Sequence, residues 1–418
     1  MKCFKKLIFS LLIILFFLFN NKVSFAIQVH SGAAILVETS TGRILYDKNS
    51  KTRMYPASVT KIMTAVLTLE NCNLDDIATV SYNAVHSLPT GYVNVNLQPG
   101  EEFLISDLLK VFMVRSANDI GSVLAEHIAG SVEDFGIMMT ERAKELGCLD
   151  TNFTNPSGIH DVNHYTTAYD LYLIANHGMQ DPVFRKLVTE TSCRLPATEL
   201  YPNDDRVFQT TNELIKINNS NRADNYYYKY ATGIKTGFTT EAKNCLVASA
   251  IRDNLEFISV VLYGGTLEGG LSERYIDTIN LFEYGYENFT ITKIIEALSI
   301  VNTVEVDKAT RETKNLNLLI QDDITVINDK STDAINTIPY IEFNDGLKAP
   351  ISKGDIVGTI TYSVDNIEYS SSLIASEDVI RKKDIEFYLL TIGLILLIFA
   401  IFIMPKRRRR NYRKKRRR

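Results

Sequence analysis

Closely spaced metal-binding side chains are missing from this sequence of 418 residues. Its five cysteines form no CxxC pair, its six histidines form no HExxH motif, and no histidine follows His177. Zinc sites usually take ligands at such short spacings, so the pattern argues against a zinc carboxypeptidase and against a structural metal. We therefore expect no metal and no other cofactor, and we interpret His160 and His164, which fall in one loop, as structural.

The cysteines show no pattern of paired spacing. Cys3 precedes the first apolar run, so it does not lie in a lipoprotein-type signal. The other four are widely separated, and their spacing does not tell whether any of them form disulfides. We expect most of these four to be small buried apolar side chains, namely Cys72, Cys148, Cys193 and Cys245.

Acidic residues are missing from both ends of the chain. Residues 1–26 combine early lysines, a run of Leu, Ile and Phe, and the small residues Ser24 and Ala26 at the close. This order is typical of a secretory signal peptide cleaved after Ala26, and a permanent anchor is the alternative.

At the other end, the run Phe387–Met404 is 18 residues long and uncharged, and "KRRRRNYRKKRRR" follows it. The pattern predicts a transmembrane helix over residues 385–404 and a basic cytoplasmic tail over residues 405–418. The expected location is the cell membrane, with one span and with the chain up to about residue 384 outside the cytoplasm. A nucleic-acid-binding arm is the alternative for the tail, but directly after a span contact with lipid is the simpler interpretation.

The chain between the two ends is strongly acidic. The first 26 residues carry four positive charges and the tail carries eleven, so residues 27–404 have a net charge of −19 although the whole chain has −4. A segment with this charge is poorly suited to bind nucleic acid or an anionic membrane surface. We expect no nucleic-acid partner.

Strands open and close the region 27–290, and helices fill its middle. "GAAILVETSTGRILYDKN" predicts a hairpin, residues 106–130 predict a helix interrupted at 115–118, and residues 167–177 predict another helix. Strand patterns return within residues 230–265, and a last helix is expected over 272–284. The order predicts an α+β catalytic domain, with an antiparallel sheet built from both ends and a helical insert. Short alternating segments over 291–378 predict a small β domain, interpreted as a spacer or binding module.

In "YPASVTKIMTA", Ser58 and Lys61 stand three residues apart, so a helix would place them on one face. A serine near a helix start lies among free backbone N–H groups. A neutral lysine can accept its proton if burial and a second cation lower the lysine pKa. Alone, the pair also fits a helix cap beside a surface lysine.

Two further motifs strengthen the first. Ser116 and Asn118 form Ser-x-Asn at the break between the helical runs, and Lys235, Thr236 and Gly237 form Lys-Thr-Gly in a strand pattern. Together with Ser-x-x-Lys, they are the motif set of penicillin-binding proteins and serine β-lactamases.

The chain resembles the low-molecular-mass penicillin-binding proteins of the D-alanyl-D-alanine carboxypeptidase family of serine peptidases. The resemblance covers about residues 30–375. It includes "NPSGIHDVNHYTTAYDLYLIA", "KTGFTTEAKNCLVASAIRDN" and "ERYIDTINLFEYGYENF". It implies the fold shared by serine β-lactamases and DD-peptidases, followed by the β domain.

The resemblance implies roles for three catalytic residues. Ser58 would be the acylated nucleophile, Lys61 its general base, and Ser116 the relay that passes a proton to the departing D-alanine.

It also implies a substrate-binding set. Asn118 would hold the substrate amide and orient the base. Lys235 and Thr236 would bind the terminal carboxylate, and the lysine charge would keep the base neutral. Gly237 would leave room for substrate along the strand, and the backbone N–H of Phe238 would complete an oxyanion hole with that of the nucleophile.

The expected function is a D-Ala-D-Ala carboxypeptidase that removes the terminal D-alanine of peptidoglycan pentapeptides and is inhibited by β-lactams. A serine β-lactamase is one alternative, although the stretch after Ser116, with "AEHIAG" and "EDFGI", has no Glu-x-x-x-Asn motif, and the chain has Ser-Ala-Asn in place of Ser-Asp-Asn. A non-catalytic wall-binding protein of the same fold is the other. Family members often end in an amphipathic helix on the membrane, whereas this chain is expected to cross it.

Overall fold

The computed structural model describes residues 27–217, 225–330, 337–344, 346–365, 367–383 and 389–402. They divide into two compact units. The first runs to Thr290 and includes Asp329 and Lys330, and the second begins at Ile291.

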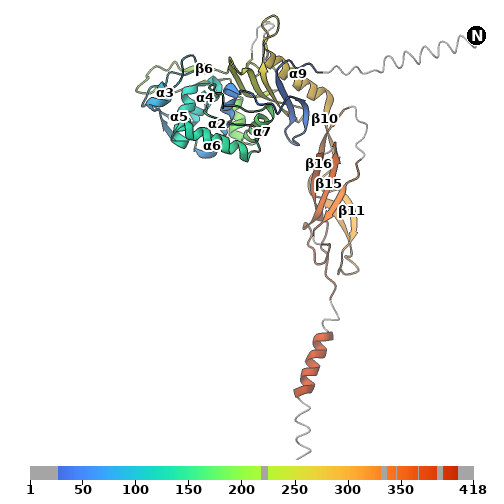
Figure 1. Cartoon of the computed structure of the whole chain (residues 1–418). Helices are drawn as coiled ribbons and strands as arrows, with labels where there is room; N and C mark the ends of the chain where they lie inside the picture. The colour runs from blue at the N-terminus through green and yellow to red at the C-terminus, as the bar shows by residue number, and fades with distance from the viewer. Residues whose placement is uncertain are drawn as a thin grey trace, which may run out of the picture. The chain divides into compact units, whose positions relative to one another are not determined.

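The first unit contains a five-stranded antiparallel sheet built from distant parts of the chain (Figure 1). Its order is β2-β1-β9-β8-β7, so β7 lies at one edge. The first strand pairs with β9 from Ala33 opposite Leu262 to Glu38 opposite Phe257. The predicted sheet from both ends is therefore confirmed. The strands are β1 (Ala33–Glu38), β2 (Ile44–Lys48), β7 (Ala231–Thr239), β8 (Lys243–Arg252) and β9 (Leu255–Gly264).

Helices cover both faces of this sheet. Alternate side chains of a strand point to opposite faces. Ile35 and Val37 join the core that includes α7 (Ala168–Gly178). Leu36 faces α9 (Glu273–Asn288), where a Cβ on Gly285 would lie 3.0 Å from its Cδ2. All six residues of β1 are therefore buried.

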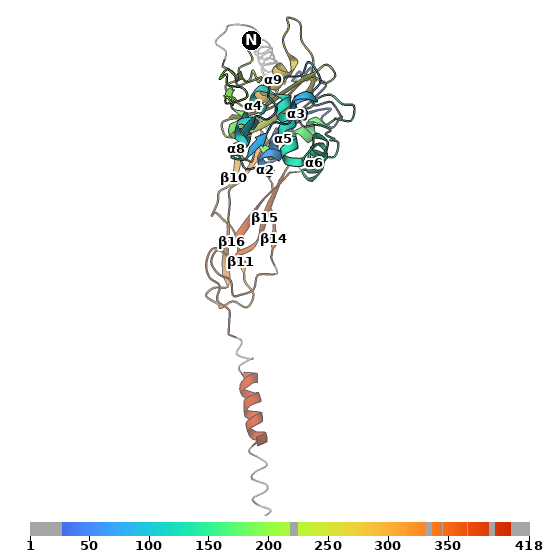
Figure 2. The same cartoon turned by 90° about the vertical axis from the view of Figure 1, so that its left-hand side faces the viewer.

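The middle of the first unit is helical, and its helices share one apolar core. Figure 2 shows α2, α5 and α6 within this helical part. The predicted interruption is confirmed, because Ser116 adopts a left-handed φ of 67° and ends α4. The helix expected over residues 167–177 is present as α7, and the Thr167 side chain caps its start by accepting a hydrogen bond from the backbone N–H of Asp170. The helices are α2 (Lys61–Asn71), α3 (Tyr82–His86), α4 (Ile105–Arg115), α5 (Asn118–Ala129), α6 (Val132–Glu145) and α8 (Pro182–Val188).

The helix expected around Ser58 differs in detail. Ser58 lies in a 3₁₀ turn, η1 (Ala57–Thr60), and α2 begins only at Lys61. Ala57, directly before the serine, has a left-handed φ of 50°. Such a backbone is unfavourable for a residue with a Cβ and persists where the surroundings hold it. The serine is thus presented at a tight entry to the helix.

Two small sheets and a buried ion pair hold the long connections. Arg206 donates to both carboxylate oxygens of Glu101, at 2.8 and 3.1 Å, and the two side chains are 4% and 0% exposed. Because a bidentate buried pair satisfies both charges, it fixes the polar segment after residue 190 against β4. The small sheets pair β3 (Ile77–Thr79) with β4 (Glu102–Leu104), and β5 (Ser192–Arg194) with β6 (Val207–Gln209).

The second unit is all β, as its alternating segments predict. Its main sheet has the order β11-β12-β16-β15-β14, with a core that includes Leu316, Leu318 and Leu373, and β10 pairs with β13. The predicted α+β class with a following β domain is confirmed. The strands are β10 (Phe289–Ile295), β11 (Ile300–Glu305), β12 (Asn315–Ile320), β13 (Ile324–Asp329), β14 (Tyr340–Phe343), β15 (Ile356–Val364) and β16 (Ile367–Ala375).

Residues 389–402 are helical. In the part of the chain that the structure describes, no helix reaches the length and apolar character needed to cross a bilayer. The rest of the expected span, the basic tail and the expected signal peptide lie outside the described residues.

The four cysteines after residue 26 are free thiols. Cys148, Cys193 and Cys245 are buried and Cys72 is half-buried, which agrees with the expectation for most of them. Burial raises the pKa of the Cys148 thiol to about 12, so this group is a poor nucleophile at neutral pH.

Candidate active site

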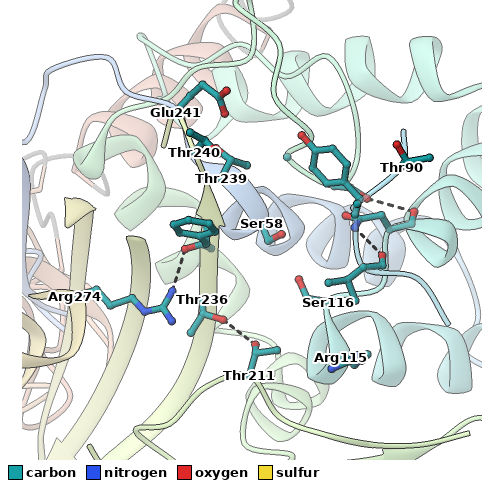
Figure 3. A pocket seen from close by; sticks show the side chains of 18 residues that line it. Ser58, Thr90, Arg115, Ser116, Thr211, Thr236, Thr239, Thr240, Glu241 and Arg274 are labelled. Carbon is teal, nitrogen blue, oxygen red and sulfur yellow. Dashed lines mark hydrogen bonds between the residues drawn. The ribbon is translucent and has the colours of Figure 1, made fainter. Parts of the chain in front are cut away.

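A pocket of about 540 Å³ opens where the edge strand β7 meets η1 and the start of α5 (Figure 3). Six of the eight predicted site residues line it, and the two lysines lie buried beside them. The structure thus brings together residues that are up to 180 positions apart in the sequence. The six lining residues are Ser58, Ser116, Asn118, Thr236, Gly237 and Phe238.

Lys61 is completely buried and its amine is held from three sides. Its Nζ lies 2.8 Å from Oδ1 of Asn118, 2.7 Å from the carbonyl oxygen of Ser157 and 3.3 Å from Oγ of Ser58. A neutral amine has two N–H donors and one lone pair. The two carbonyl oxygens can take the donors, which leaves the lone pair for the Ser58 hydroxyl.

The surroundings of Lys61 favour this neutral form. Burial holds its pKa well below the usual value, the nearby charge of Lys235 lowers the pKa further, and Asp119 opposes both. Burial penalises the charged form because an ammonium loses its hydration there. Burial is thus the larger cause, and the second lysine adds to it, as the resemblance implied.

The start of α5 also shapes a wall of the pocket. The backbone N–H and the Nδ2 of Asn118 both donate to the carbonyl oxygen of Val93, at 2.8 and 2.7 Å. The carboxylate of Asp119, which is 1% exposed, accepts from the N–H of Val95 at 2.9 Å. The segment that includes Val93 is therefore fixed to the residue that orients Lys61. The sequence motif included Asn118 but gave no sign of its neighbour's role.

The Lys-Thr-Gly motif lies on β7, and among the described residues no other strand covers the outer edge of β7. An added Cβ on Gly237 would lie 3.0 Å from the backbone nitrogen of Ser58 and 2.9 Å from the carbonyl oxygen of Pro56, so only glycine fits this approach. Thr236 shares a 2.7 Å hydrogen bond with Thr211. A free strand edge next to the serine is where an extended peptide can bind.

Lys235 is 1% exposed and donates to the carbonyl oxygen of Thr236 at 3.1 Å. Burial, and then the charge of Arg274, lowers its pKa to about 7. Arg274 was not predicted as a site residue, although it lies in the family-like stretch "ERYIDTINLFEYGYENF". Its Nη1 donates to the carbonyl oxygen of Gly237 at 3.1 Å, and its side chain lines the pocket.

The loop "NPSG" supplies a second unpredicted part of the site. The Asn155 side-chain oxygen accepts from the N–H groups of Ser157, Gly158 and Ile159 at 3.1, 2.8 and 3.0 Å. A Cβ on Gly158 would lie only 1.8 Å from the carbonyl oxygen of Ala57. The loop therefore packs on the turn that contains Ser58 and holds the Ser157 carbonyl toward Lys61. Its turn-forming residues were visible in the sequence, but their target was not.

His164 supports the η1 turn, which contains Ser58, through a buried hydrogen bond. Its Nε2 shares a 2.8 Å hydrogen bond with Oγ1 of Thr60, between the serine and the lysine, and its Nδ1 accepts from the N–H of Thr154 at 3.1 Å. Burial lowers its pKa to about 3. The structural interpretation of this histidine agrees with these contacts.

The arrangement is suited to acyl transfer. It joins a hydroxyl, a buried amine that can take its proton, and cations in a pocket beside a free strand edge. Within the described residues, no group of three or more His, Cys, Asp or Glu side chains is placed to hold a metal.

Residues 20–266 match the family model described as D-alanyl-D-alanine carboxypeptidase, and residues 289–385 match the one described as penicillin-binding protein 5, C-terminal domain. The chain belongs to the D-alanyl-D-alanine carboxypeptidase family. The resemblance seen in the sequence is therefore confirmed.

Similar proteins extend over both units. D-alanyl-D-alanine carboxypeptidase DacF of Bacillus subtilis is 31% identical over 354 residues, which are 84% of this chain and 86% of that protein. The crystal structure of penicillin binding protein 5 from Haemophilus influenzae has a TM-score of 0.66 at 26% identity and covers 85% of this chain and 99% of its own. A regulatory factor of peptidoglycan synthesis (PBP3) from Streptococcus pneumoniae, with a TM-score of 0.69 at 23% identity over 84% of this chain and 100% of its own, shows the same fold.

The buried histidine predicts a pH dependence of stability. The unfolded chain takes up a proton on His164 below about pH 6.5, whereas the folded chain keeps the imidazole neutral down to about pH 3. The unfolded state then binds more protons, so the free energy of unfolding falls as the pH falls, by up to about 1.4 kcal/mol per pH unit from this group. Chemical denaturation from about pH 7.5 to about pH 5 measures the slope. His164→Asn should flatten it, the exposed control His127→Asn should not, and equal slopes in all three proteins would contradict the assignment.

Proposed function

We propose that this protein is a serine-type D-Ala-D-Ala carboxypeptidase that removes the terminal D-alanine of peptidoglycan pentapeptides and is acylated by penicillins. The observation that carries the proposal is the buried Lys61, whose Nζ lies 3.3 Å from Oγ of Ser58. The match to the carboxypeptidase family supports it. Similar proteins such as DacF of Bacillus subtilis are named for this activity.

The first step is acylation of Ser58. Its hydroxyl donates to the neutral amine of Lys61, and Oγ attacks the carbonyl carbon of the penultimate D-alanine. The backbone N–H groups of Ser58 and Phe238 stabilise the oxyanion that develops. The close approach of Gly237 to the backbone nitrogen of Ser58 supports this role, because it brings β7 and η1 into contact beside the pocket.

The second step expels the terminal D-alanine. The proton taken by Lys61 passes through the Ser116 hydroxyl to the leaving amine, and water then hydrolyses the ester with Lys61 again as the base. The left-handed backbone of Ser116 supports the relay, since it turns this residue toward the pocket that Ser58 also lines.

Lys235, Thr236 and Arg274 recognise the terminal carboxylate, and Asn118 holds the amide of the substrate. A carboxylate beside Lys235 favours its charged form and raises a pKa that burial has lowered. The carboxylate brings a negative charge that offsets the charge of Lys235, so burial remains the main reason that Lys61 is neutral when substrate is bound.

The mature protein is proposed to act outside the cytoplasm on a membrane anchor. A signal peptide at residues 1–26 directs export, residues 27–290 form the catalytic domain, residues 291–378 the β domain, and residues 385–404 the single span. The apolar run Phe387–Met404 and the eleven basic residues of the tail support the anchor.

Penicillin labelling tests the function directly. The exported part, incubated with benzylpenicillin, should gain one penicilloyl group on Ser58 by mass spectrometry, and it should release D-alanine from a pentapeptide. Ser58→Ala should lose both activities. Rapid turnover of penicillin without peptide hydrolysis would favour a β-lactamase, and the absence of any label would favour a non-catalytic wall-binding protein.

Lys61→Arg separates a base from a charge partner. Arginine keeps a positive charge but has no accessible neutral form, so it cannot take the serine proton. We expect the rate of penicillin acylation to fall about 100-fold or more. A rate near that of the wild type would rule out the general-base role.

Lys235 is tested with a graded series. The proposal predicts that kcat/KM for peptides with a free C-terminal carboxylate falls from wild type to Lys235→Arg and again to Lys235→Ala, because arginine keeps a cation for the carboxylate. Peptides with an amidated C-terminus should be poor substrates for the wild type and should lose little more in the alanine variant.

The two peptides and three proteins form a double-mutant cycle in which the coupling measures recognition of the carboxylate. If removal of Lys235 harms acid and amide peptides equally, carboxylate binding is excluded. Lys235 would then act only through Lys61 or through the fold.

Deletion from Asp384 onward tests the anchor. The truncated protein should be exported, released from the membrane after signal cleavage, and as active as the full chain on penicillin. Fractionation of cells followed by penicillin labelling measures both properties. Retention of the truncated, processed protein in the membrane would show that the anchor lies elsewhere.

A further inference from the structure

The pocket around Ser58 has opposite charges at its two ends. Arg115 and Arg274 line one end, and Glu241 lines the other, with Ser58 between them (Figure 3). Glu241 is the one carboxylate among the described residues that line this pocket. It is exposed, in the turn after β7, and forms no ion pair or side-chain hydrogen bond with another described residue.

The direction of a bound peptide follows from the proposed function, on which this inference rests. The reacting carbonyl lies at Ser58, and the terminal carboxylate points to Lys235 and Arg274. The residues that precede the reacting carbonyl must then leave in the other direction along β7, past Phe238 toward Glu241. No strand in the described part of the chain pairs with this edge, so an extended peptide can follow it.

The length of such a peptide determines which of its side chains can contact Glu241. β7 ends at Thr239, and Glu241 lies in the turn that follows, so its carboxylate lines the pocket just beyond the end of the strand edge. The residue that directly precedes D-Ala-D-Ala lies one Cα step of about 3.8 Å further along the substrate. From that residue, a long side chain with a terminal amine can extend along the pocket toward the Glu241 carboxylate. The neighbouring Lys243 does not line the pocket, so its charge does not occupy the same place.

We propose that Glu241 binds the side-chain ammonium of a diamino acid that directly precedes D-Ala-D-Ala. The enzyme would then distinguish peptides in which this amine is free from peptides in which it is acylated. Acylation removes the charge that the carboxylate recognises and adds bulk at the same place. Glu241 is thus a specificity-determining residue, and it takes no part in the transfer of the acyl group.

The test compares two substrates that differ only in this charge. They are a tripeptide Nα-acetyl-L-Lys-D-Ala-D-Ala with a free side-chain amine and the same peptide acetylated on that amine. Because the ion pair is exposed, the free amine should raise kcat/KM by about two- to fivefold at low salt. The preference should shrink at about 0.5 M NaCl, where screening is strong.

Three variants locate the effect. Glu241→Gln should bring the ratio of the two kcat/KM values close to one, and Glu241→Lys should reverse it. The matched control Glu141→Gln removes an exposed carboxylate of α6 that does not line the pocket, and it should keep the wild-type ratio. Benzylpenicillin acylation should stay unchanged in the control Glu141→Gln, and in the two Glu241 variants it serves to normalise the peptide rates to the amount of protein with an intact nucleophile and base.

The outcomes separate this inference from the function beneath it. Hydrolysis of neither peptide by the wild type would overturn the proposed carboxypeptidase activity. Hydrolysis of both with equal kcat/KM, or a preference that survives in Glu241→Gln and Glu241→Lys, would overturn the role of Glu241 and leave the activity standing.

Discussion

The burial of two lysines beside one serine is the constraint on which the site depends. Lys61 is 0% exposed and Lys235 is 1% exposed, and no carboxylate of the described residues forms an ion pair with either. Burying an unpaired ammonium costs several kcal/mol, so a buried lysine tends to lose its proton instead. The fold thereby favours the neutral form of a residue that is normally charged at neutral pH, and it does so before any substrate arrives.

Holding a neutral amine in place requires acceptors on fixed supports. Asn118 is tied to Val93 by its backbone and its side chain, and the Ser157 carbonyl is held by the Asn155 turn packed on Ala57. The left-handed backbones of Ala57 and Ser116 store local strain, which the apolar core beneath them can hold. The same packing explains why a buried, neutral His164 is tolerated, although it costs stability in acid.

The end of the pocket near Glu241 is more exposed to solvent than the end beside the two lysines. Lys61 and Lys235 are fully buried, whereas Phe238 is 61% exposed and Glu241 lies at the surface of the pocket. Charges in water interact weakly and are screened by salt, so they discriminate between substrates by small factors. Buried groups act strongly because water is excluded. This division lets the outer part of the pocket vary in substrate preference without changing the chemistry at Ser58.

The sequence by itself determined the α+β order, the break at Ser116, the helix over residues 167–177 and the seven residues of the three motifs, because helix periods and short motifs are local patterns. It misplaced Ser58 in an α-helix, since a 3₁₀ turn and an α-helix have similar patterns over one turn. Only the tertiary structure decided that the Ser157 carbonyl, Arg274, Asp119 and His164 serve the same site. A backbone carbonyl looks alike at every residue, and contacts between segments 100 residues apart leave no local pattern, so their partners are set by how the sheet and helices pack.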